Sequence, residues 1–569
     1  MRPRRFLVAL LVVAVAAAAV LVDAAPPRRP ADVAVVPASA LAPVATADDA
    51  ASSTWYCVAG TASKGGPADH TVVVANPTER TAEGRMEIFP VGGDPVTVPL
   101  QVAAGSRESI AVGTKVEAPF AAAVVEIAAG GVVAEHEVRG SAGWDSGRCA
   151  SAASTQWYFA WGRTAGAANL SFALLNPFPE DAVVDLTFET EEGFVAPTAL
   201  EGLLVPARRL VVVDVTEQVS VRTRVATTVS TRAGRIVAER IQTIVGADGV
   251  SAVDLGLGAP APATVWNFAE GRAAAATGEQ FSVFNPTEEP AEVEIVVERS
   301  GAGTGGAPAP FEVRVPAGGA AQVVLNQESR IALPIRHTTT ARSVNGVPVV
   351  VERITATGSI AKVLFGDLGT DTTITTSTTT STTTSTTTAP TTTTTAPAPE
   401  ATTVPPASTT TTTTTTTAPT TTTAPGTTTT TPGSTTAPGG LVALPTGFSA
   451  TLGLPVVAGR WVLATGARDG LVDASVSVLN VTTSELALTV TTFDRGRAAS
   501  LTAPARIGPG QRVEIPLTLP KGTTGYLVVV EASGAVVVDR LQPSRTPAEL
   551  AVEPAIPTPG GGTPPAVAS

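Results

Sequence analysis

The sequence predicts an all-β protein made of tandem immunoglobulin-like or fibronectin-like antiparallel β-sandwich repeats. The 569-residue chain contains one pattern four times: a tryptophan segment, a later asparagine, and an acidic residue near the end of a Val-rich stretch. Within each copy, apolar and polar residues alternate with a period of two, as in strands with one buried face. Gly and Pro interrupt the chain too often for long helices, so each copy should form about seven short strands.

The third copy shows the strand pattern most clearly. Val293, Ile295 and Val297 occupy alternate positions and should face a core. The sequence Pro-Ala-Gly-Gly at 316–319 is a turn signal between two strands. Such patterns predict strands near residues 266–268, 280–284, 292–298, 311–315, 321–325, 336–342 and 349–354.

Changes in composition divide the chain into repeats and connecting segments. After a predicted signal peptide or membrane-anchor helix at 1–25, residues 26–51 are rich in Ala, Pro and Val and should form a flexible tether. Residues 369–440 are nearly all Thr, Ser, Pro, Ala and Gly, so a disordered stalk is expected before the fourth repeat. The predicted repeats, strung like beads, are 52–150, 151–258, 259–368 and 441–548, with a disordered tail at 549–569.

The N-terminal residues predict export from the cytoplasm. Arg4 and Arg5 precede an apolar run at 6–22, as in a secretory signal, and Val22 and Ala24 fit a small-residue cleavage site. The same run reaches the lower length limit for a transmembrane helix, so a retained anchor is the alternative. Either interpretation predicts an extracellular or cell-surface protein that contacts the membrane only through residues 6–22.

Cysteine usage and charge narrow the function classes further. In an exported chain Cys57 and Cys149, which bracket the first repeat, predict a disulfide, and two unrelated buried thiols are the alternative. The formal charge of −12 is spread without blocks and the lysines lie far apart, so the chain has no phosphate-binding stripe. We therefore expect no nucleic-acid partner.

Three kinds of residue mark equivalent places in the four copies. Aromatic residues are only 4% of the chain, so the tryptophans should supply core volume. Carbohydrate stacking is the alternative, and it would need exposed aromatics such as Tyr158 and Trp161. The asparagines should end a strand and cap the turn that follows. The markers are Trp55, Trp157, Trp266 and Trp461; Asn76, Asn176, Asn285 and Asn480; and Glu135, Glu239, Glu352 and Asp539.

The acidic markers occupy an unusual position. Glu239 lies between Val237 and Ile241 in the period-two row, which puts a carboxylate on an otherwise apolar face. A buried carboxylate must be hydrogen-bonded or paired to stay ionised. We expect each one to accept hydrogen bonds from the tryptophan segment or from loop N–H groups, pinning the first strand of a repeat to its last.

No arrangement of residues in the sequence indicates catalysis. The three histidines lie apart without metal-ligand spacing, and no phosphate-binding loop or dinucleotide fingerprint is present. We expect no enzyme activity, no catalytic residue, no metal and no cofactor. The predicted function is a non-enzymatic cell-envelope protein with a structural, adhesive or scaffolding role. A carbohydrate- or peptidoglycan-binding module in an envelope glycan pathway is the alternative. Cell-wall glycan or another envelope protein are the partners considered.

The opening segments resemble a family of secreted actinobacterial proteins. Residues 157–162, Trp-Tyr-Phe-Ala-Trp-Gly, and 266–271, Trp-Asn-Phe-Ala-Glu-Gly, are similar to the Trp-Tyr-Phe-Ala-Glu-Gly repeats of a domain of unknown function. Asn-Pro-Thr, Val-Pro-Ala-Gly and Val-Glu-Arg elements are similar as well. The resemblance covers the first three repeats and, more loosely, the fourth, whose segment at 461–466 departs at several positions. It implies an exported envelope protein with β-sandwich repeats, and it supplies no activity.

Overall fold

Antiparallel strands form nearly all of the regular structure, so the all-β sandwich class predicted from the sequence is confirmed. The computed structural model describes residues 37–300, 308–366, 368, 444–464, 474–501, 503–517, 525–545, 548–559 and 565–568. The predicted signal or anchor at 1–25 and the predicted stalk at 369–440 lie outside these ranges. Within them, no helix combines the length and apolar character that a membrane span requires.

The first two repeats each stack an outer sheet on an inner sheet. In the first repeat the outer order is β1 (Ser53–Cys57), β6 (Ala121–Ile127), β3 (Ala82–Pro90), β4 (Val96–Val102), and the inner order is β5 (Ser106–Ala111), β2 (Asp69–Asn76), β7 (Val133–Gly140), β8 (Gly143–Arg148). In the second repeat the outer order is β12 (Gly193–Val195), β11 (Ala182–Thr190), β15 (Val225–Ala233), β9 (Gln156–Phe159), with β13 (Leu203–Val205) on β11. Its inner order is β14 (Arg209–Asp214), β10 (Ala168–Asn176), β16 (Val237–Val245), β17 (Ser251–Leu257).

The third repeat keeps this plan and adds a helix. Its outer order is β18 (Val265–Phe268), β24 (Ile335–Ser343), β21 (Ala291–Arg299), β22 (Phe311–Val315), with β19 (Arg272–Ala273) on β24. Its inner order is β23 (Ala320–Val324), β20 (Thr277–Phe284), β25 (Val350–Thr357), β26 (Gly447–Leu452). Helix α2 (Gly358–Phe365) follows β25. Short 3-10 helices lie at η1 (Ala38–Ala40), η2 (Val112–Thr114), η3 (Thr198–Leu200) and η4 (Leu325–Gln327).

The fourth repeat joins its two layers through one long strand, β33 (Leu527–Arg545). Residues 527–532 pair with β29 (Leu486–Asp494), and residues 536–541 pair with β28 (Ser475–Asn480). The other strands are β27 (Val456–Leu463), β30 (Arg497–Ser500), β31 (Arg506–Ile507), β32 (Arg512–Pro516), β34 (Ala548–Pro554), β35 (Ile556–Thr558) and β36 (Ala566–Val567). Strand β34 pairs with β33 from Asp539↔Pro554 to Arg545↔Ala548, so the predicted disordered tail at 549–569 is wrong for this strand.

The last inner strand of the third repeat comes from beyond the Thr-rich segment. Strand β26 pairs with β25 from Glu352↔Leu452 to Thr357↔Gly447. The predicted boundaries 259–368 and 441–548 are therefore wrong at this point, because residues 447–452 complete the third repeat. The Thr-rich segment is an insertion within a sandwich.

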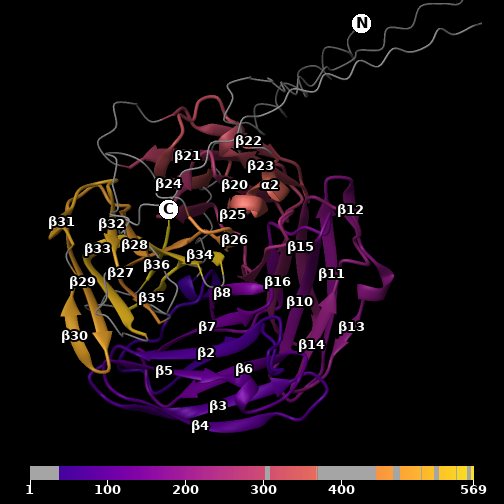
Figure 1. Cartoon of the computed structure of the whole chain (residues 1–569), viewed down its shortest axis with the longest axis vertical. Helices are drawn as coiled ribbons and strands as arrows, with labels where there is room; N and C mark the ends of the chain where they lie inside the picture. The colour runs from indigo at the N-terminus through magenta and orange to yellow at the C-terminus, as the bar shows by residue number, and fades with distance from the viewer. Residues whose placement is uncertain are drawn as a thin grey trace, which may run out of the picture. The chain divides into compact units, whose positions relative to one another are not determined.

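Four equivalent inner strands meet at the centre of the described unit. Strand β8 contacts β17, β17 contacts β26, β26 contacts β34, and β34 contacts β8. Figure 1 shows the repeats in successive colours around these strands, from indigo through magenta and orange to yellow. The four sandwiches therefore form a closed ring in chain order.

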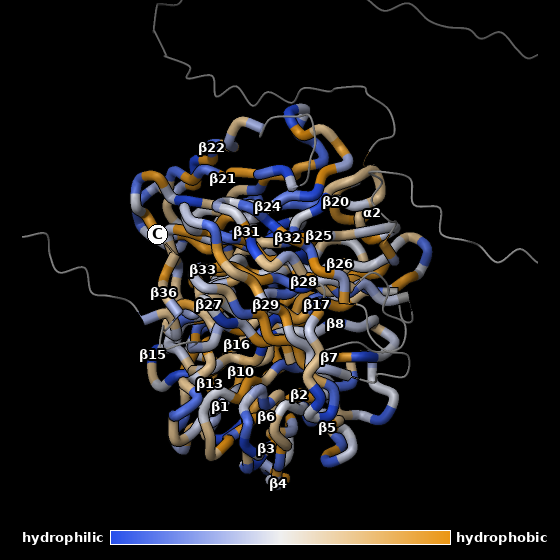
Figure 2. The backbone as a smooth tube through the Cα atoms, turned by 90° about the vertical axis from the view of Figure 1, so that its left-hand side faces the viewer, coloured by the Kyte–Doolittle hydropathy of each residue, from blue (hydrophilic) through white to orange (hydrophobic). Residues whose placement is uncertain are grey.

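Hydrophobic clusters cross the borders between repeats. One cluster combines Trp55 and Met86 of the first repeat with Val462, Leu527 and Ile556 of the fourth. The two other large clusters join the first repeat to the second and the third repeat to the fourth. Hydrophobic and hydrophilic positions alternate along many strands in Figure 2. The expectation of separate sandwiches strung like beads is wrong, because neighbouring repeats bury apolar surface against each other.

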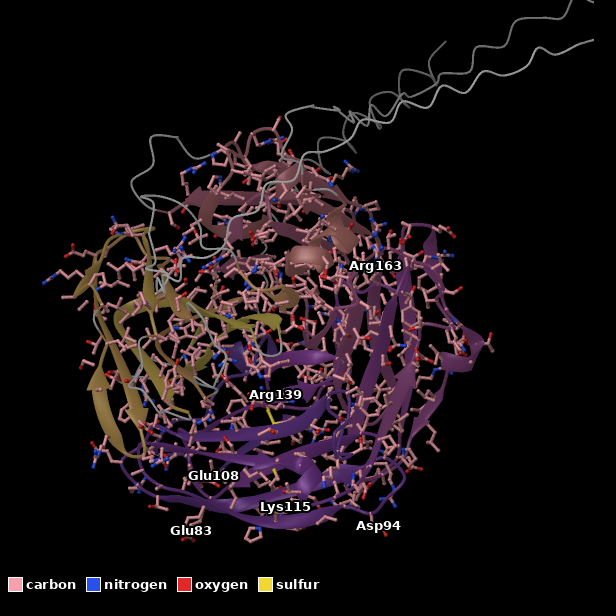
Figure 3. All side chains as sticks on the ribbon, in the orientation of Figure 1. Glu83, Asp94, Glu108, Lys115, Arg139 and Arg163 are labelled. Carbon is pink, nitrogen blue, oxygen red and sulfur yellow. A yellow bond between two sulfur atoms is a disulfide. The ribbon has the colours of Figure 1, made fainter. Side chains whose placement is uncertain are left out.

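The predicted disulfide is confirmed within the first repeat. Cys57 in β1 and Cys149 after β8 are bonded, and their Cα atoms lie 4.5 Å apart. The bond appears in yellow in Figure 3, which also labels exposed charged residues of this repeat such as Glu83 and Asp94. The disulfide links the outer sheet to the end of the central strand β8.

Residues 37–50 run along the ring as a strap, and the flexible tether predicted at 26–51 is wrong for this part. The N–H of Val44 donates to Ser151 Oγ at 3.1 Å, and the N–H of Ala45 donates to Pro557 O at 3.0 Å. The carbonyl of Thr46 accepts from Gly131 N at 3.2 Å. The strap therefore connects the first two repeats with strand β35 near the C-terminus.

Candidate functional site

The marker tryptophans lie in the sandwich cores. All six tryptophans of the chain are at most 2% exposed. The indole N–H of Trp55, Trp157 and Trp266 donates to the carbonyl of Val132, Ile236 and Val349, at 3.0, 2.9 and 2.8 Å. Each acceptor precedes the strand that carries the acidic marker, so the tryptophan ties the outer sheet to the inner one. Trp461 instead donates to Ala458 O at 3.0 Å.

The marker asparagines close a turn and also join the two sheets. Asn76 Nδ2 donates to Arg80 O at 2.7 Å and to Val102 O at 3.0 Å, while its Oδ1 accepts from Thr78 N at 3.1 Å. Val102 ends β4 in the outer sheet, whereas Asn76 ends β2 in the inner sheet. The same three kinds of bond recur at Asn176, Asn285 and Asn480.

The acidic markers join one repeat to the next. Glu239 Oε2 accepts from Ala59 N at 2.7 Å and from Val58 N at 3.2 Å, both in the tryptophan segment of the first repeat. Glu352 in turn accepts from Ala160 N at 3.0 Å in the second repeat. Asp539 accepts from two N–H groups of the third, Ala269 at 2.9 Å and Glu270 at 3.0 Å. The expected donors are present, but the expectation that they belong to the same repeat is wrong.

The residue after each acidic marker is basic, and it pairs with the marker of the following repeat. The N···O distances are 2.8 Å for His136–Glu239, 2.6 Å for Arg240–Glu352, 3.6 Å for Arg353–Asp539 and 2.6 Å for Arg540–Glu135. Every one of these side chains is at most 2% exposed. The fourth pair returns to the first repeat, so the eight residues form a closed cycle, which we call the junction cycle.

Arg240 makes a dense set of hydrogen bonds within the junction cycle. Its guanidinium donates to Trp161 O and Glu352 at 2.6 Å, to Ala450 O at 2.9 Å and to Asp254 at 3.0 Å. Burial alone would lower the pKa of Arg240, but Glu352 and Asp254 raise it above its usual value. A buried charge needs this density of partners, because each ion loses its hydration when it leaves water.

His136 takes the place that arginine holds in the other three repeats. His70 Nδ1 lies 2.8 Å from Ala121 O, which can only accept, so His70 Nδ1 donates. Burial and the neighbouring His136 lower the pKa of His70 to about 3, which keeps His70 neutral. His70 Nε2 therefore accepts from His136 Nδ1 at 3.0 Å, while His136 Nε2 faces Glu239 at 2.8 Å. His136 Nε2 thus faces the acidic marker of the second repeat, where an arginine stands at the other three junctions.

The third pair of the junction cycle is the loosest. Aspartate is one methylene shorter than glutamate, and Arg353 Nη1 stays 3.6 Å from Asp539 Oδ2, beyond hydrogen-bond distance. The next carboxylate, Glu279, is 3.8 Å from Arg353 Nε. Arg353 therefore lacks the charge-assisted hydrogen bond that Arg240 makes.

Restoring the missing methylene should strengthen this junction. We expect Asp539→Glu to increase the free energy of unfolding by about 1–2 kcal/mol, since a hydrogen bond to a charged group contributes on that scale. The matched control, Glu352→Asp, should lose a similar amount, because it lengthens the bond to Arg240. Urea unfolding of the full chain measures both changes. Equal stability of both variants and the wild type would contradict this account of the junction cycle.

The contact between the third and fourth repeats also includes Glu270, the glutamate of the third tryptophan segment. Glu270 Oε2 accepts from Ser477 Oγ at 2.6 Å, and Glu270 forms ion pairs with Arg272 and Arg512. Burial raises the pKa of Glu270, but Arg272 and Arg512 outweigh it and hold the pKa well below its usual range. The glutamate of the Trp-Asn-Phe-Ala-Glu-Gly segment thus binds the third repeat to the fourth.

The four central strands are joined by side chains. Asp145 in β8 accepts from Leu255 N of β17 at 2.7 Å, and Asp254 in β17 accepts from Ala450 N of β26 at 2.5 Å. Ser449 Oγ in β26 accepts from Val552 N of β34 at 3.1 Å. The equivalent position in β34 is Ala551, which has no acceptor in its side chain. Each of these bonds runs from one repeat to the next.

Glu549 occupies one end of the central strands. Its carboxylate accepts from Phe448 N at 3.0 Å and from Val253 N at 3.1 Å. A Cβ at Gly447 would lie 2.6 Å from the backbone N of Leu550, and Gly143 has a φ of +126°, so both positions favour glycine. A Cβ at either position would also lie within 2.5 Å of a carboxylate oxygen of Glu549. Burial raises the pKa of Glu549 well above its usual value.

The central carboxyls should make stability fall as pH rises. Burial, opposed by Arg148 and reinforced by Asp254, raises the pKa of Glu553 to about 8 from 4.5. The folded state then holds a proton that the unfolded state releases, so this contribution is complete below pH 4.5 and is lost toward pH 8. We expect Glu553→Gln to leave the melting temperature unchanged at pH 5 and to raise it by a few degrees at pH 8.5. An equal shift at both pH values would show that the proton is not responsible.

The residues named for glycan binding are not exposed. Trp161 is 2% exposed and its ring packs edge-on against Phe448, with centroids 6.0 Å apart. Tyr158 is half-buried. A surface pocket of about 400 Å³ lies beside the strap, and the side chains that line it, including Ser39, Pro43 and Trp157, carry no acid or base. Among the described residues, no group of three or more His, Cys, Asp or Glu side chains is placed to hold a metal ion.

Three solved structures show a distant likeness to this chain. No family model matches the sequence, and no curated protein matches it. A crystal structure of Thermotoga maritima 1070 is 18% identical over 17% of this chain and 84% of that chain, with a TM-score of 0.15. The Anabaena sensory rhodopsin transducer is 26% identical over 16% of this chain and 88% of its own, also with a TM-score of 0.15. A tetra-tandem repeat from the extending region of a large adhesion protein is 10% identical over 88% and 97%, with a TM-score of 0.09. Scores this low establish no functional relationship.

The sequence identified the acidic half of the junction cycle and missed the basic half. His136, Arg240, Arg353 and Arg540 directly follow the acidic markers, so the repeated acid–base dipeptide was the available signal. The central residues Asp145, Asp254 and Glu549 left no common pattern, because the four central strands differ in sequence.

Proposed function

We propose that this chain is an exported, non-enzymatic structural protein of the cell envelope, in which the ring carries the Thr/Pro-rich segment as a loop. The proposal rests on the two places where the Thr/Pro-rich segment leaves and rejoins the third repeat. Thr357 Oγ1 donates to Gly447 O at 3.3 Å and also bonds Pro445 O. The chain therefore leaves the third repeat after α2 and returns beside the same residues.

The chemistry of the ring supports a structural role. Charged residues of the junction cycle are buried and bonded to the neighbouring repeat, so they serve cohesion between repeats. The apolar N-terminal run at 6–22 supports export, and the dense Thr and Pro of the segment are typical of extended surface stalks. A closed ring of four sandwiches that carries this Thr/Pro-rich segment as an insertion suits spacing, adhesion or scaffolding in a wall.

Cell fractionation with N-terminal sequencing tests the proposal. We expect the full chain in the envelope or culture fraction, either cleaved after the apolar run or retained with it. Recovery in the cytoplasm with an intact N-terminus would contradict export. A variant in which a short Gly/Ser linker replaces residues 369–443 should keep the folded ring and lose any surface-spacing or adhesive effect.

A pull-down on purified cell wall distinguishes this proposal from the alternative, a glycan-binding module. Binding that the loop-deleted variant retains in full would favour a glycan-binding module on the ring. Binding that disappears with the loop supports the proposed display role.

A further inference from the structure

The fourth and first repeats meet without a direct peptide link. Arg540 pairs with Glu135 across a sequence separation of 405 residues. Strand β34 contacts β8, and Arg107 Nη1 donates to Ala464 O at 3.2 Å. Apolar residues of the fourth repeat, such as Leu527, share a cluster with Trp55. This seam is held by non-covalent contacts alone, whereas short segments connect the other repeats at their borders.

One long connector joins the C-terminal piece to the rest. Residues 447–569 comprise β26 and the fourth repeat, and they follow β25 and α2 only through residues 366–446. A fully extended chain of this length reaches on the order of 250 Å. The effective concentration that a connector gives falls as the connector lengthens, to about millimolar or below at this length, so a neighbouring copy competes when the protein is concentrated.

The surfaces of the C-terminal piece fit any copy of the ring. Strand β26 completes β25 by hydrogen bonds, Asp539 accepts from Ala269 and Glu270, and Arg540 meets Glu135. None of these contacts depends on the connector. We propose that residues 447–569 exchange between two copies of the chain, so that the fourth repeat of each copy completes the ring of the other. This exchange depends on the ring, not on the proposed envelope role.

Isotope labelling with a cleavable connector tests the exchange. A site for a sequence-specific protease is inserted between Thr410 and Thr411, and equal amounts of unlabelled and ¹⁵N-labelled full chains are refolded together at high concentration. We expect a dimer of twice 57.2 kDa whose share grows with protein concentration. After cleavage, native mass spectrometry should show rings of monomer mass, about half of them mixing a light and a heavy fragment.

Three outcomes would overturn the proposal: no dimer, a dimer that keeps its mass after cleavage, or rings that contain fragments of one label only. Separately purified light and heavy monomers, cleaved and then mixed, are the control for exchange after cleavage. This control should give few hybrid rings over the same time.

Charge reversal gives a second measurement. Glu135→Arg in one chain and Arg540→Glu in another each place like charges at the seam of their own ring. An exchanged pair contains one ring with both reversals and one with neither, so each has opposite charges. We expect co-expression to give several-fold more dimer than either variant or the wild type alone. No enrichment on co-expression would contradict exchange at this seam.

Discussion

Cleaving the chain within residues 371–440 is expected to leave both fragments in one particle. The C-terminal fragment carries β26, which pairs with β25 over six residues of the third repeat. It also carries Asp539 and Arg540, whose partners lie in the third and first repeats. These contacts come with shared hydrophobic clusters, so the fragments should separate only on unfolding. Size-exclusion chromatography after limited proteolysis measures the result.

The expected trace is a single peak that contains both fragments at a ratio of one to one. Addition of urea should release them together with the loss of tryptophan fluorescence, because all six tryptophans are buried in the ring. A C-terminal fragment that elutes alone in native buffer would show that the fourth repeat is an independent bead. The uncleaved chain is the control for elution volume.

Glu352→Ala is expected to cost about 3–5 kcal/mol of the free energy of unfolding. Removing one member of a buried ion pair leaves the other charge desolvated and without its partner. Here Arg240 would lose its bond to Glu352, and Ala160 N would lose its acceptor. The effect requires the full chain, because Arg240 and Ala160 belong to the second repeat. Urea unfolding followed by fluorescence measures it.

An exposed pair supplies the control for this loss. Arg506 and Glu485 lie 2.8 Å apart, but their side chains are 71% and 54% exposed. Glu485→Ala should change stability by less than about 1 kcal/mol, because water screens such a pair. The double variant Arg240→Met with Glu352→Met should not recover this loss, because it leaves the buried Asp254 without its arginine partner. If Glu352→Ala lowers the free energy of unfolding no more than Glu485→Ala does, the junction cycle does not hold the repeats together.

Local patterns predicted the strands of each sandwich well. Strand β22 occupies Phe311–Val315, the range expected from the sequence, and β24 at Ile335–Ser343 extends the expected 336–342 by one residue at each end. The strand β26 was missed because its partner β25 lies across the Thr-rich insertion. A period of two identifies a strand but not its neighbour, so pairing over such a distance cannot be read from it.

The junction cycle was only half predictable for the same reason. The alternation around Glu239 showed that a carboxylate faces a buried environment and needs donors. It could not show that Val58 and Ala59 of the previous repeat provide them. The face of a strand follows from its own sequence, whereas what packs on that face depends on how whole sandwiches dock.

Glu549 limits which repeat can stand beside it in the ring. Its side chain fills the space that a larger residue at Gly143 or Gly447 would need. A duplicated or shuffled repeat would therefore bring a second bulky side chain, or none, to this end of the four central strands. At this end of the central strands, a gain of side-chain volume at Gly143 or Gly447 must therefore be matched by a loss of volume at Glu549.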